Sequence, residues 1–299
     1  MTTTDSGMDD EGLFKRVLSI MRVFRQPAFY PPMRILLVKT SSLGDVIHNL
    51  PVVTDLLAQF PDASIDWCVE ESFAEIPRLH PGVHKVIPVA VRRWRKSLTS
   101  LATWRQIGEF RRKLGNDEYD VILDTQGLVK SAVIARQAQG RHCGYAAEVA
   151  REPLAARFYD ATFVIPPNVH AVDRNRWLAA AAFDYLNGGP LDYGIAAPAF
   201  SADWLPTGPH AVLLTATSRD DKLWDEAHWC ELGKALLERG ITPILPSGSP
   251  RERARAERIA QVLPGAIVAP PLRLTELAGL IGMAKLAVEI GRASCRERV

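Results

Sequence analysis

The sequence predicts an α/β protein built from two Rossmann-like domains that face each other across a cleft. From Met33 onward, apolar runs typical of strands alternate with segments of helical periodicity, which favours stacked βαβ units around a parallel sheet. Gly and Pro are concentrated at residues 187–209, and a second alternation follows them. A chain of 299 residues also exceeds most single cores. We therefore expect domains at residues 33–190 and 210–288, joined by a linker at 191–209.

The elements of the first domain follow from apolar patterning. Residues 35–38 read Ile-Leu-Leu-Val without polar alternation, as expected of a parallel strand buried on both faces. Further along, we expect strands at 64–69 and 119–124, and helices at 104–114 and 170–186. Polar residues follow these strands, so a parallel arrangement would gather them at one edge of the sheet.

The second domain shows the same alternation over a shorter length. We expect strands at 211–214, 242–245, 266–269 and 286–288, and helices at 226–239, 251–262 and 275–284.

Composition excludes several classes of protein. With 47% apolar and 23% charged residues the chain is typical of a soluble globular protein, and a net charge of +2 gives no global attraction to nucleic acid. The four cysteines are scattered and form no CxxC pair, which argues against a disulfide framework and a zinc site. His80 and His84 flank Pro81-Gly82 and therefore lie on a turn. We expect no metal and no cofactor.

The turn after the first strand carries the first candidate for chemistry. Ser41 and Ser42 supply hydroxyls, Gly44 permits close approach of the backbone to a ligand, and Asp45 opens an apolar-periodic helix that continues through Val53. Asp45 has two interpretations, a helix N-cap or a general base at the mouth of a cleft. Spacing alone favours the N-cap.

A basic cluster follows residues 86–91. It places four cations within five residues, and its members are Arg92, Arg93, Arg95 and Lys96, with Trp94 between them. Such a cluster is a solvated face, an anion-binding site or, with its aromatic residue, a nucleic-acid patch. Because the cluster is single and local, nucleic acid ranks below an anionic ligand, to which Trp94 adds a stacking or membrane-interface contact.

The second domain lacks both G-x-x-x-x-G-K-[ST] and G-x-G-x-x-G. Residues 215–224 nevertheless offer the Thr217 and Ser218 hydroxyls and the Lys222 ammonium after a strand, which suit a departing diphosphate. The alternative is a polar turn with Lys222 in solvent. Glu252 opens a later helix, where its carboxylate complements the helix dipole.

Five motifs together resemble the lipopolysaccharide heptosyltransferase I family, within glycosyltransferase family 9. They are Lys39-Thr-Ser-Ser-Leu-Gly-Asp-Val46, Val91-Arg-Arg-Trp-Arg-Lys96, Asp124-Thr-Gln-Gly-Leu-Val-Lys130, Arg151-Glu-Pro-Leu154 and Thr217-Ser-Arg-Asp-Asp-Lys222. The resemblance runs in order from about Met33 to Val288. It implies the GT-B fold and metal-independent, inverting transfer of L-glycero-D-manno-heptose from ADP-heptose to the inner Kdo of Kdo2-lipid A.

The resemblance also implies roles for residues. Asp45 becomes the general base, supported by Lys39 and by the hydroxyls of Ser41 and Ser42. The acceptor side comprises Lys39, Ser41, Ser42, Gly44, Arg92, Arg93, Arg95, Lys96, Asp124, Gln126 and Lys130, although Asp124 equally suits a helix cap. The donor side comprises Thr217, Ser218, Lys222 and Glu252. The enzyme is expected in the cytoplasm, in peripheral contact with the inner membrane. Two alternatives stay open, a heptosyltransferase II-like enzyme with another core acceptor and an inactive nucleotide-sugar-binding fragment.

Both ends of the chain differ from this pattern. Residues 1–32 contain a basic amphipathic stretch, with Leu13, Val17, Ile20 and Phe24 at helical spacing, and they either lie on a membrane or arise from a wrongly assigned start codon. Residues 289–299 lack apolar periodicity and resemble a translated sequencing adaptor. We expect a truncated gene joined to foreign sequence, with an incomplete second domain.

Overall fold

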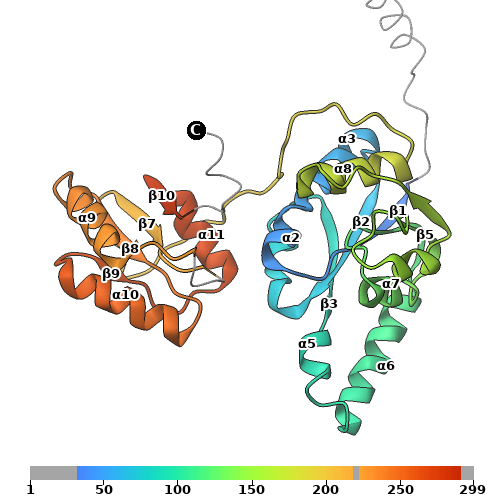
Figure 1. Cartoon of the computed structure of the whole chain (residues 1–299), viewed down its shortest axis with the longest axis horizontal. Coiled ribbons are helices and arrows are strands. Elements are labelled where there is room, and N and C mark those ends of the chain that lie inside the picture. The colour runs from blue at the N-terminus through green and yellow to red at the C-terminus, as the bar shows by residue number, and fades with distance from the viewer. Residues whose placement is uncertain (1–31, 218–221, 291–299) are drawn as a thin grey trace, which may run out of the picture.

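A computed structural model describes residues 32–217 and 222–290, which form two parallel sheets (Figure 1). The first sheet has the strand order β3-β2-β1-β4-β5-β6, and the second has the order β10-β7-β8-β9. In each sheet the first strand of the domain, β1 or β7, lies in the interior. The chain adds later strands on one side of it and then on the other, as in Rossmann folds. Within the described ranges, no helix has the length and apolarity needed to cross a membrane.

The first domain contains six strands and the helices that cover them. The strands are β1 (Arg34–Val38), β2 (Ser64–Glu70), β3 (Val83–Val89), β4 (Glu118–Asp124), β5 (Gln139–Tyr145) and β6 (Ala161–Phe163). The helices are α2 (Leu43–Ile47), α3 (Leu50–Gln59), α4 (Glu75–Arg78), α5 (Val91–Trp94), α6 (Leu101–Gly115), α7 (Val129–Ala135) and α8 (Ala171–Ala182), with 3-10 turns at Glu71–Phe73 and Pro153–Phe158.

The second domain repeats the alternation. Its elements are β7 (His210–Leu214), α9 (Glu226–Leu237), β8 (Thr242–Leu245), α10 (Pro250–Val262), β9 (Ile267–Val268), α11 (Leu274–Met283) and β10 (Leu286–Glu289). No helix or strand lies in residues 183–209, the stretch that contains the predicted linker.

The central strand β1 is buried on both faces, which accounts for its lack of polar alternation. Ile35 and Leu37 belong to one apolar cluster, which includes residues of α3 and α8. Leu36 and Val38 belong to the opposite cluster, which includes residues of α6 and α7. All four side chains are fully buried. This packing fixes the carboxyl end of β1, from which the turn to Asp45 departs.

Most predicted elements are present, and two predictions are wrong in detail. The helix expected to run from Asp45 through Val53 is two helices, α2 and α3. Pro51 stands at the start of α3, where its missing N–H group needs no partner, so the chain begins a new helix there. The helix expected to end at residue 186 ends at Ala182, because Asp184 adopts a φ of 53° that no helix continues.

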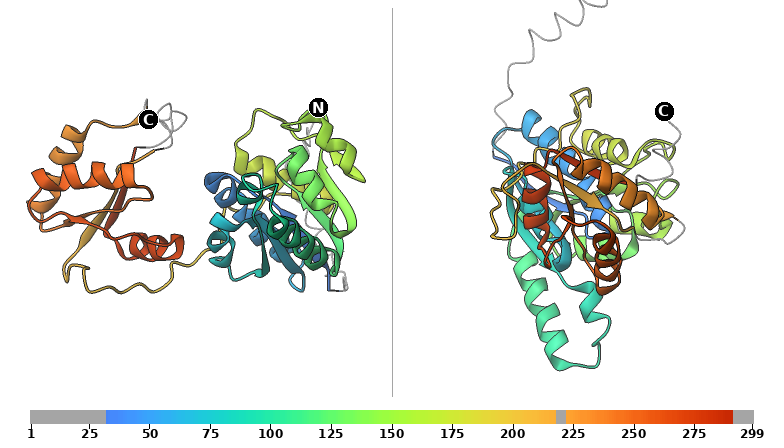
Figure 2. Two further views of the ribbon diagram at one scale, coloured as in Figure 1. Left: turned by 90° about the horizontal axis from the view of Figure 1, so that it is seen from below. Right: turned by 90° about the vertical axis from the view of Figure 1, so that its left-hand side faces the viewer.

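The two domains touch at the N-terminus of α11, which lies toward the first domain (Figure 2). The Thr275 backbone N–H and hydroxyl donate to the Glu75 carboxylate at 2.9 and 3.0 Å. Leu274 packs against the first domain's apolar cluster. A carboxylate from one domain therefore caps a helix of the other.

Some predicted features lie outside the described residues. These are the amphipathic stretch within residues 1–31, Ser218 and residues 291–299. Strand β10 includes Glu289, which pairs with Leu214 of β7, so it is one residue longer than predicted.

Candidate active site

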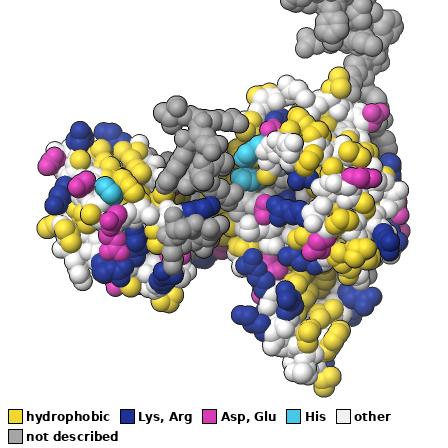
Figure 3. Space-filling view, in the orientation of Figure 1, with side chains coloured by type: hydrophobic (Ala, Val, Ile, Leu, Met, Phe, Trp, Pro, Cys, Tyr) yellow, Lys and Arg dark blue, Asp and Glu magenta, His cyan; other side chains and the backbone are white. Residues whose placement is uncertain are grey.

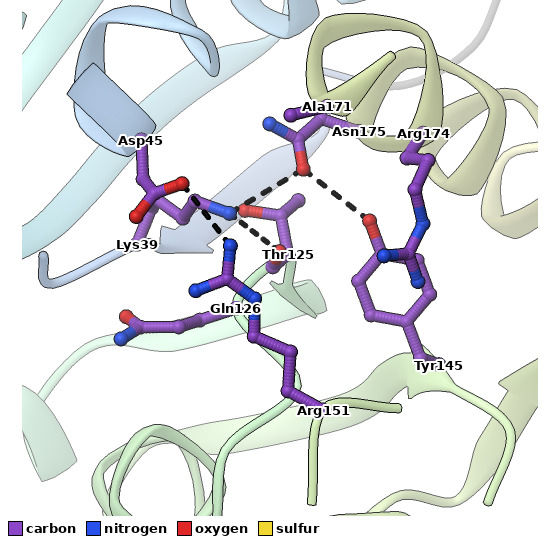
Figure 4. Close-up of a pocket in the computed structure, with 9 residues that line it drawn as sticks. All are labelled: Lys39, Asp45, Thr125, Gln126, Tyr145, Arg151, Ala171, Arg174 and Asn175. Carbon is purple, nitrogen blue, oxygen red and sulfur yellow. Dashed lines mark hydrogen bonds and ion pairs between the residues drawn. The ribbon is translucent and has the colours of Figure 1, made fainter. Parts of the chain in front are cut away.

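Polar side chains gather at the carboxyl edge of the first sheet and line a pocket (Figure 4). The lining residues are Lys39, Asp45, Thr125, Gln126, Tyr145, Arg151, Ala171, Arg174 and Asn175. They come from the ends of β1, β4 and β5, from the first turn of α2, from the segment after β5 and from α8. The parallel register places these strand ends together, as the sequence predicted.

Asp45 is held from both sides. Its Oδ2 accepts hydrogen bonds from the Ser42 backbone N–H and hydroxyl, each 3.0 Å long. Its Oδ1 accepts one from Arg151 Nη2 at 3.2 Å. Ser42 is the N-cap of α2 and Asp45 is the third helical residue, so the N-cap interpretation of Asp45 is wrong. The Ser42 bonds orient the carboxylate, and the other oxygen points to the pocket.

The surroundings keep Asp45 ionised. Burial by itself raises the pKa of this carboxyl, but the Ser42 hydrogen bonds and the charges of Lys39 and Arg151 more than offset it. The pKa of Asp45 therefore lies below its ordinary value. A carboxylate in this state can accept a proton late in a reaction, when an attacking hydroxyl has become acidic.

Lys39 lies beneath Asp45 and is almost completely buried. Its Nζ donates to the Thr125 carbonyl at 2.8 Å and to Asn175 Oδ1 at 3.4 Å. Burial lowers the pKa of Lys39 to about 8, while the negative charge of Asp45 acts in the opposite direction. The Asn175 amide also accepts from the Tyr145 hydroxyl and donates to the His48 carbonyl, which fixes its orientation.

Two arginines add positive charge on the far side of the pocket. Arg151 pairs with Asp45, and the Arg174 guanidinium lies 4.9 Å from the centre of the Tyr145 ring. Arg174 Nη2 donates to the Val149 carbonyl, and its Nε is buried without a hydrogen-bond partner among the described residues. Three cations around one carboxylate suit a ligand that brings both an anion and a hydroxyl group.

Sequence reasoning gave no role to five of the polar residues that line the pocket. They are Thr125, Tyr145, Arg151, Arg174 and Asn175. Arg151 stood in a family motif, which was the available signal. Arg174 and Asn175 stand in a helix whose pattern indicates only packing, and β5 was not predicted.

Gln126 and Lys130 support the turn that carries Asp45. Gln126 Oε1 accepts from the Thr40 backbone N–H at 2.7 Å and from its hydroxyl at 2.8 Å. Lys130 Nζ donates to Ser41 Oγ at 3.0 Å. The structure thus places Gln126 and Lys130, both predicted on the acceptor side, in contact with Thr40 and Ser41 in the turn that leads to Asp45. Gly44 lies inside α2, where its carbonyl accepts from the His48 N–H.

Asp124 does not line the pocket. It is fully buried, and its Oδ1 accepts from the Gln126 N–H at 2.8 Å, while Oδ2 accepts from the Tyr159 hydroxyl at 2.8 Å. It does not cap α7 either, because the N-cap of that helix is Leu128. Its carboxylate instead shapes a turn in which Gly127 has a φ of 66°. Burial raises the pKa of Asp124.

The basic cluster lies on α5 and the two residues after it, and α5 follows β3 at the same sheet edge. Arg93 forms two hydrogen bonds to Glu71, at 2.9 and 3.0 Å, so its charge is already paired. Trp94 packs edge-on against Phe110 and donates to Gln106, which makes it a support between α5 and α6. Arg92, Arg95 and Lys96 are exposed. The cluster therefore offers fewer available cations than its sequence indicates.

The donor-side residues stand in the second domain, away from the pocket lining. Thr217 and Lys222 flank the undescribed residues 218–221. Glu252 lies in the first turn of α10, and its Oε2 accepts from the Gly248 N–H at 2.6 Å. This matches the helix-dipole alternative, and contact with a donor stays a prediction. In the described ranges, no cluster of three His, Cys, Asp or Glu side chains is arranged to hold a metal ion.

Comparison with known proteins supplies the family. Residues 107–290 match the model of glycosyltransferase family 9 (heptosyltransferase). Lipopolysaccharide heptosyltransferase 1 of Pseudomonas aeruginosa is 45% identical over 260 residues, which cover 86% of this chain and 73% of that protein. The chain belongs to glycosyltransferase family 9. As a member of this family it is a glycosyltransferase, which agrees with the resemblance of its motifs.

Solved structures of family 9 members confirm the fold. E. coli heptosyltransferase WaaC with ADP-2-deoxy-2-fluoro heptose is 44% identical, with a TM-score of 0.78 over 85% of this chain and 82% of that one. E. coli ADP-heptose lipopolysaccharide heptosyltransferase II, at 20% identity and a TM-score of 0.66 over 85% of this chain and 78% of that one, shares the fold. The family 9 chain described here therefore has the predicted GT-B architecture of two Rossmann-like domains.

Proposed function

We propose that this family 9 glycosyltransferase moves L-glycero-D-manno-heptose from ADP-heptose to the inner Kdo of Kdo2-lipid A during synthesis of the lipopolysaccharide core. The observation that carries the proposal is the pocket in which the Asp45 carboxylate stands among Lys39, Arg151 and Arg174. An acceptor sugar acid presents both a hydroxyl to deprotonate and a carboxylate to bind. The relative from Pseudomonas aeruginosa is named lipopolysaccharide heptosyltransferase 1, and the WaaC structure is named a heptosyltransferase with an ADP-heptose analogue, which supports heptose transfer.

Asp45 acts as the general base in this proposal. Its carboxylate takes the proton from the acceptor hydroxyl as that oxygen attacks the anomeric carbon of the heptose. The carbon–oxygen bond to ADP breaks on the opposite face, so the configuration inverts in one displacement. The transition state is oxocarbenium-like, as in inverting glycosidases, and the proton moves late enough for a weak base to receive it.

Arg151 and Arg174 orient the acceptor. An Arg guanidinium binds a carboxylate through two parallel hydrogen bonds, and both Arg151 and Arg174 line the pocket. The Lys39 ammonium adds its positive charge to the pocket. Its hydrogen bonds to the Thr125 carbonyl and to Asn175 Oδ1 fix its position. Binding the acid group there places the hydroxyl near Asp45.

The second domain stabilises the leaving group in this proposal. The Thr217 hydroxyl and the Lys222 ammonium donate to the departing diphosphate, together with Ser218, and Glu252 contacts donor hydroxyls. These cationic and hydroxyl donors neutralise the developing charge, so we propose that no metal ion is required. Transfer that persists in excess EDTA supports this part of the proposal. Transfer that EDTA abolishes and added Mg²⁺ restores contradicts it.

The proposed acceptor sets where the protein works. Kdo2-lipid A is held in a bilayer by its acyl chains, so the pocket must reach the membrane surface. We place the protein at the cytoplasmic face of the inner membrane, in peripheral contact with it.

A mass-spectrometric assay tests the function. The purified protein is incubated with ADP-heptose and Kdo2-lipid A, and the expected product is heavier by one heptosyl unit. A parallel reaction offers an acceptor that already carries the first heptose. Addition only to this second acceptor would identify a heptosyltransferase II-like enzyme, and addition to neither would refute transfer by this chain.

A further inference from the structure

Large apolar side chains are exposed at the end of the projection that α5 and α6 form. Leu98 is 52% exposed, Leu101 is 79% exposed and Trp104 is 57% exposed. We call these three residues the tip. Figure 3 shows hydrophobic side chains at the lower end of the projection, with Lys and Arg beside them.

The tip is ordered by its own contacts. Trp104 Nε1 donates to the Leu98 carbonyl at 2.8 Å, so the polar group of the indole is already satisfied. The remaining surface of the ring is apolar and can enter an apolar phase without losing a hydrogen bond to water. At the other end of α6, Phe110 and Leu114 are buried in the domain core and anchor the projection.

The charge around the tip is strongly positive. Residues 91–115 contain eight Lys and Arg side chains and one acid, Glu109, whereas the whole chain has a net charge of only +2. Arg95, Lys96 and Arg105, which adjoin the tip in sequence, are exposed. Apolar side chains surrounded by cations are the pattern of a protein segment that lies on an anionic bilayer.

The projection leaves the domain on the side of the pocket. Helix α5 begins at Val91, directly after β3 ends at Val89, and the carboxyl end of β3 lies at the same edge as Asp45. Figure 1 shows α5 and α6 extending beyond the sheet. A membrane touched by the tip therefore lies on the side of the protein where the pocket is.

We propose that the tip inserts into the headgroup region of an anionic phospholipid bilayer, with the adjoining cations bound to lipid phosphates. This inference rests on the proposed function in one respect, since a lipid-anchored acceptor gives the contact its purpose. The tip then holds the pocket at the height of the acceptor sugar and leaves the chemistry unchanged.

Vesicle flotation tests the contact. The full chain is mixed with vesicles of phosphatidylcholine alone or with phosphatidylglycerol, and compared with the variant Leu98→Gln/Leu101→Gln/Trp104→Gln. A matched control changes three exposed apolar residues elsewhere, as Leu186→Gln/Leu191→Gln/Val262→Gln. We expect the tip variant to bind anionic vesicles about tenfold more weakly, and the control to bind normally. Equal binding of the three proteins, or no binding by the unaltered chain, overturns the proposal.

A second readout separates this inference from the proposed function. Transfer of heptose to a water-soluble Kdo acceptor without acyl chains should be the same in the tip variant and the unaltered chain. Transfer to Kdo2-lipid A in vesicles should fall in the tip variant alone. If the unaltered chain transfers heptose to neither acceptor, the proposed function fails while flotation still decides the role of the tip. Equal transfer to the vesicle acceptor by both proteins overturns the inference.

Discussion

Asp45 combines a structural and a chemical role because a carboxylate has two oxygens. One oxygen holds the Ser42 N–H and hydroxyl at the start of α2, and the other faces Arg151 in the pocket. The same side chain therefore completes a helix terminus and remains accessible to a ligand. An asparagine at position 45 would separate the two roles. Its amide oxygen accepts hydrogen bonds but takes no proton at neutral pH.

The substitution Asp45→Asn should preserve the fold and remove transfer. The amide oxygen can still accept from Ser42, whereas the loss of the base should lower kcat by about 10²–10⁴-fold. Circular dichroism should show an unchanged spectrum, and the mass assay should show little product. Asp62→Asn, at an exposed position, serves as the matched control. Turnover of the Asp45 variant within about threefold of the unaltered enzyme would leave Asp45 with its helical role only.

Lys39 should limit activity at high pH. Burial lowers the pKa of its ammonium to about 8, so the charge is present below that pH and lost above it. We expect kcat/KM, which reports the free enzyme, to be level near neutrality and to fall about tenfold per pH unit above about 8.

The variant Lys39→Arg tests the assignment of this pH dependence. Because a guanidinium stays charged, the descending limb of the profile should disappear or move well above pH 9. A descending limb unchanged in the Arg variant would assign the titration to another group.

At the scale of elements, helix α5 and the two residues after it present the available cations of the basic cluster. Arg93 is paired with Glu71, which leaves Arg92, Arg95 and Lys96 for a ligand. Replacing these three with Gln should raise KM for Kdo2-lipid A by about tenfold, because exposed charges act through screened attraction. Rising salt should have a similar effect on the unaltered enzyme.

The control for this prediction lies on α6. The triple substitution of the exposed residues Arg111, Arg112 and Lys113 with Gln removes the same charge from the neighbouring helix. KM for ADP-heptose should be constant in both variants. If KM rose equally for donor and acceptor, the basic cluster would act through the overall charge of the protein. It would then make no specific contact with the acceptor.

At the scale of the whole molecule, one carboxylate links the two domains. Glu75 accepts both hydrogen bonds of Thr275 at the N-terminus of α11. The variant Glu75→Ala should loosen this contact, because charge-assisted hydrogen bonds are worth on the order of 1.5–3 kcal/mol. Small-angle scattering without substrates should show a larger radius of gyration. Glu118→Ala, an exposed change in the first domain, should scatter like the unaltered chain. Identical curves for all three proteins would mean that packing at Leu274 holds the domains together.

Local patterns predicted the elements best where burial was uniform. Strand β8 has the predicted bounds, and β1 and β7 each begin one residue earlier than predicted, because continuous apolar runs leave few alternatives. Strand β5 went unpredicted, since Gln139-Gly-Arg-His is polar at its start. The break between α2 and α3 was missed because the apolar spacing continues across it. Pro51 favours the first turn of a new helix, which begins at Leu50, and this preference outweighs the spacing.

The candidate site was likewise predicted only in part. Asp45 and its turn were found because a strand, small residues and an acid follow one another within a few positions. Asp124 was assigned to the acceptor, but its burial beneath Gln126 depends on how β4 packs beside β1 and β5. Trp94 was assigned to a ligand or membrane, although its position against Phe110 depends on the return of α6.

The order of elements, the two-domain division and the acid after the first strand were encoded in the sequence alone, because apolar period and turn chemistry act over short distances along the chain. The electrostatics of the pocket required the tertiary structure. Asn175 is 136 positions from Lys39, and Arg151 is 106 positions from Asp45. Burial of the parallel sheet brings these residues together, and the same burial lowers the pKa of Lys39. No local pattern records either effect, since both depend on which surfaces exclude water together.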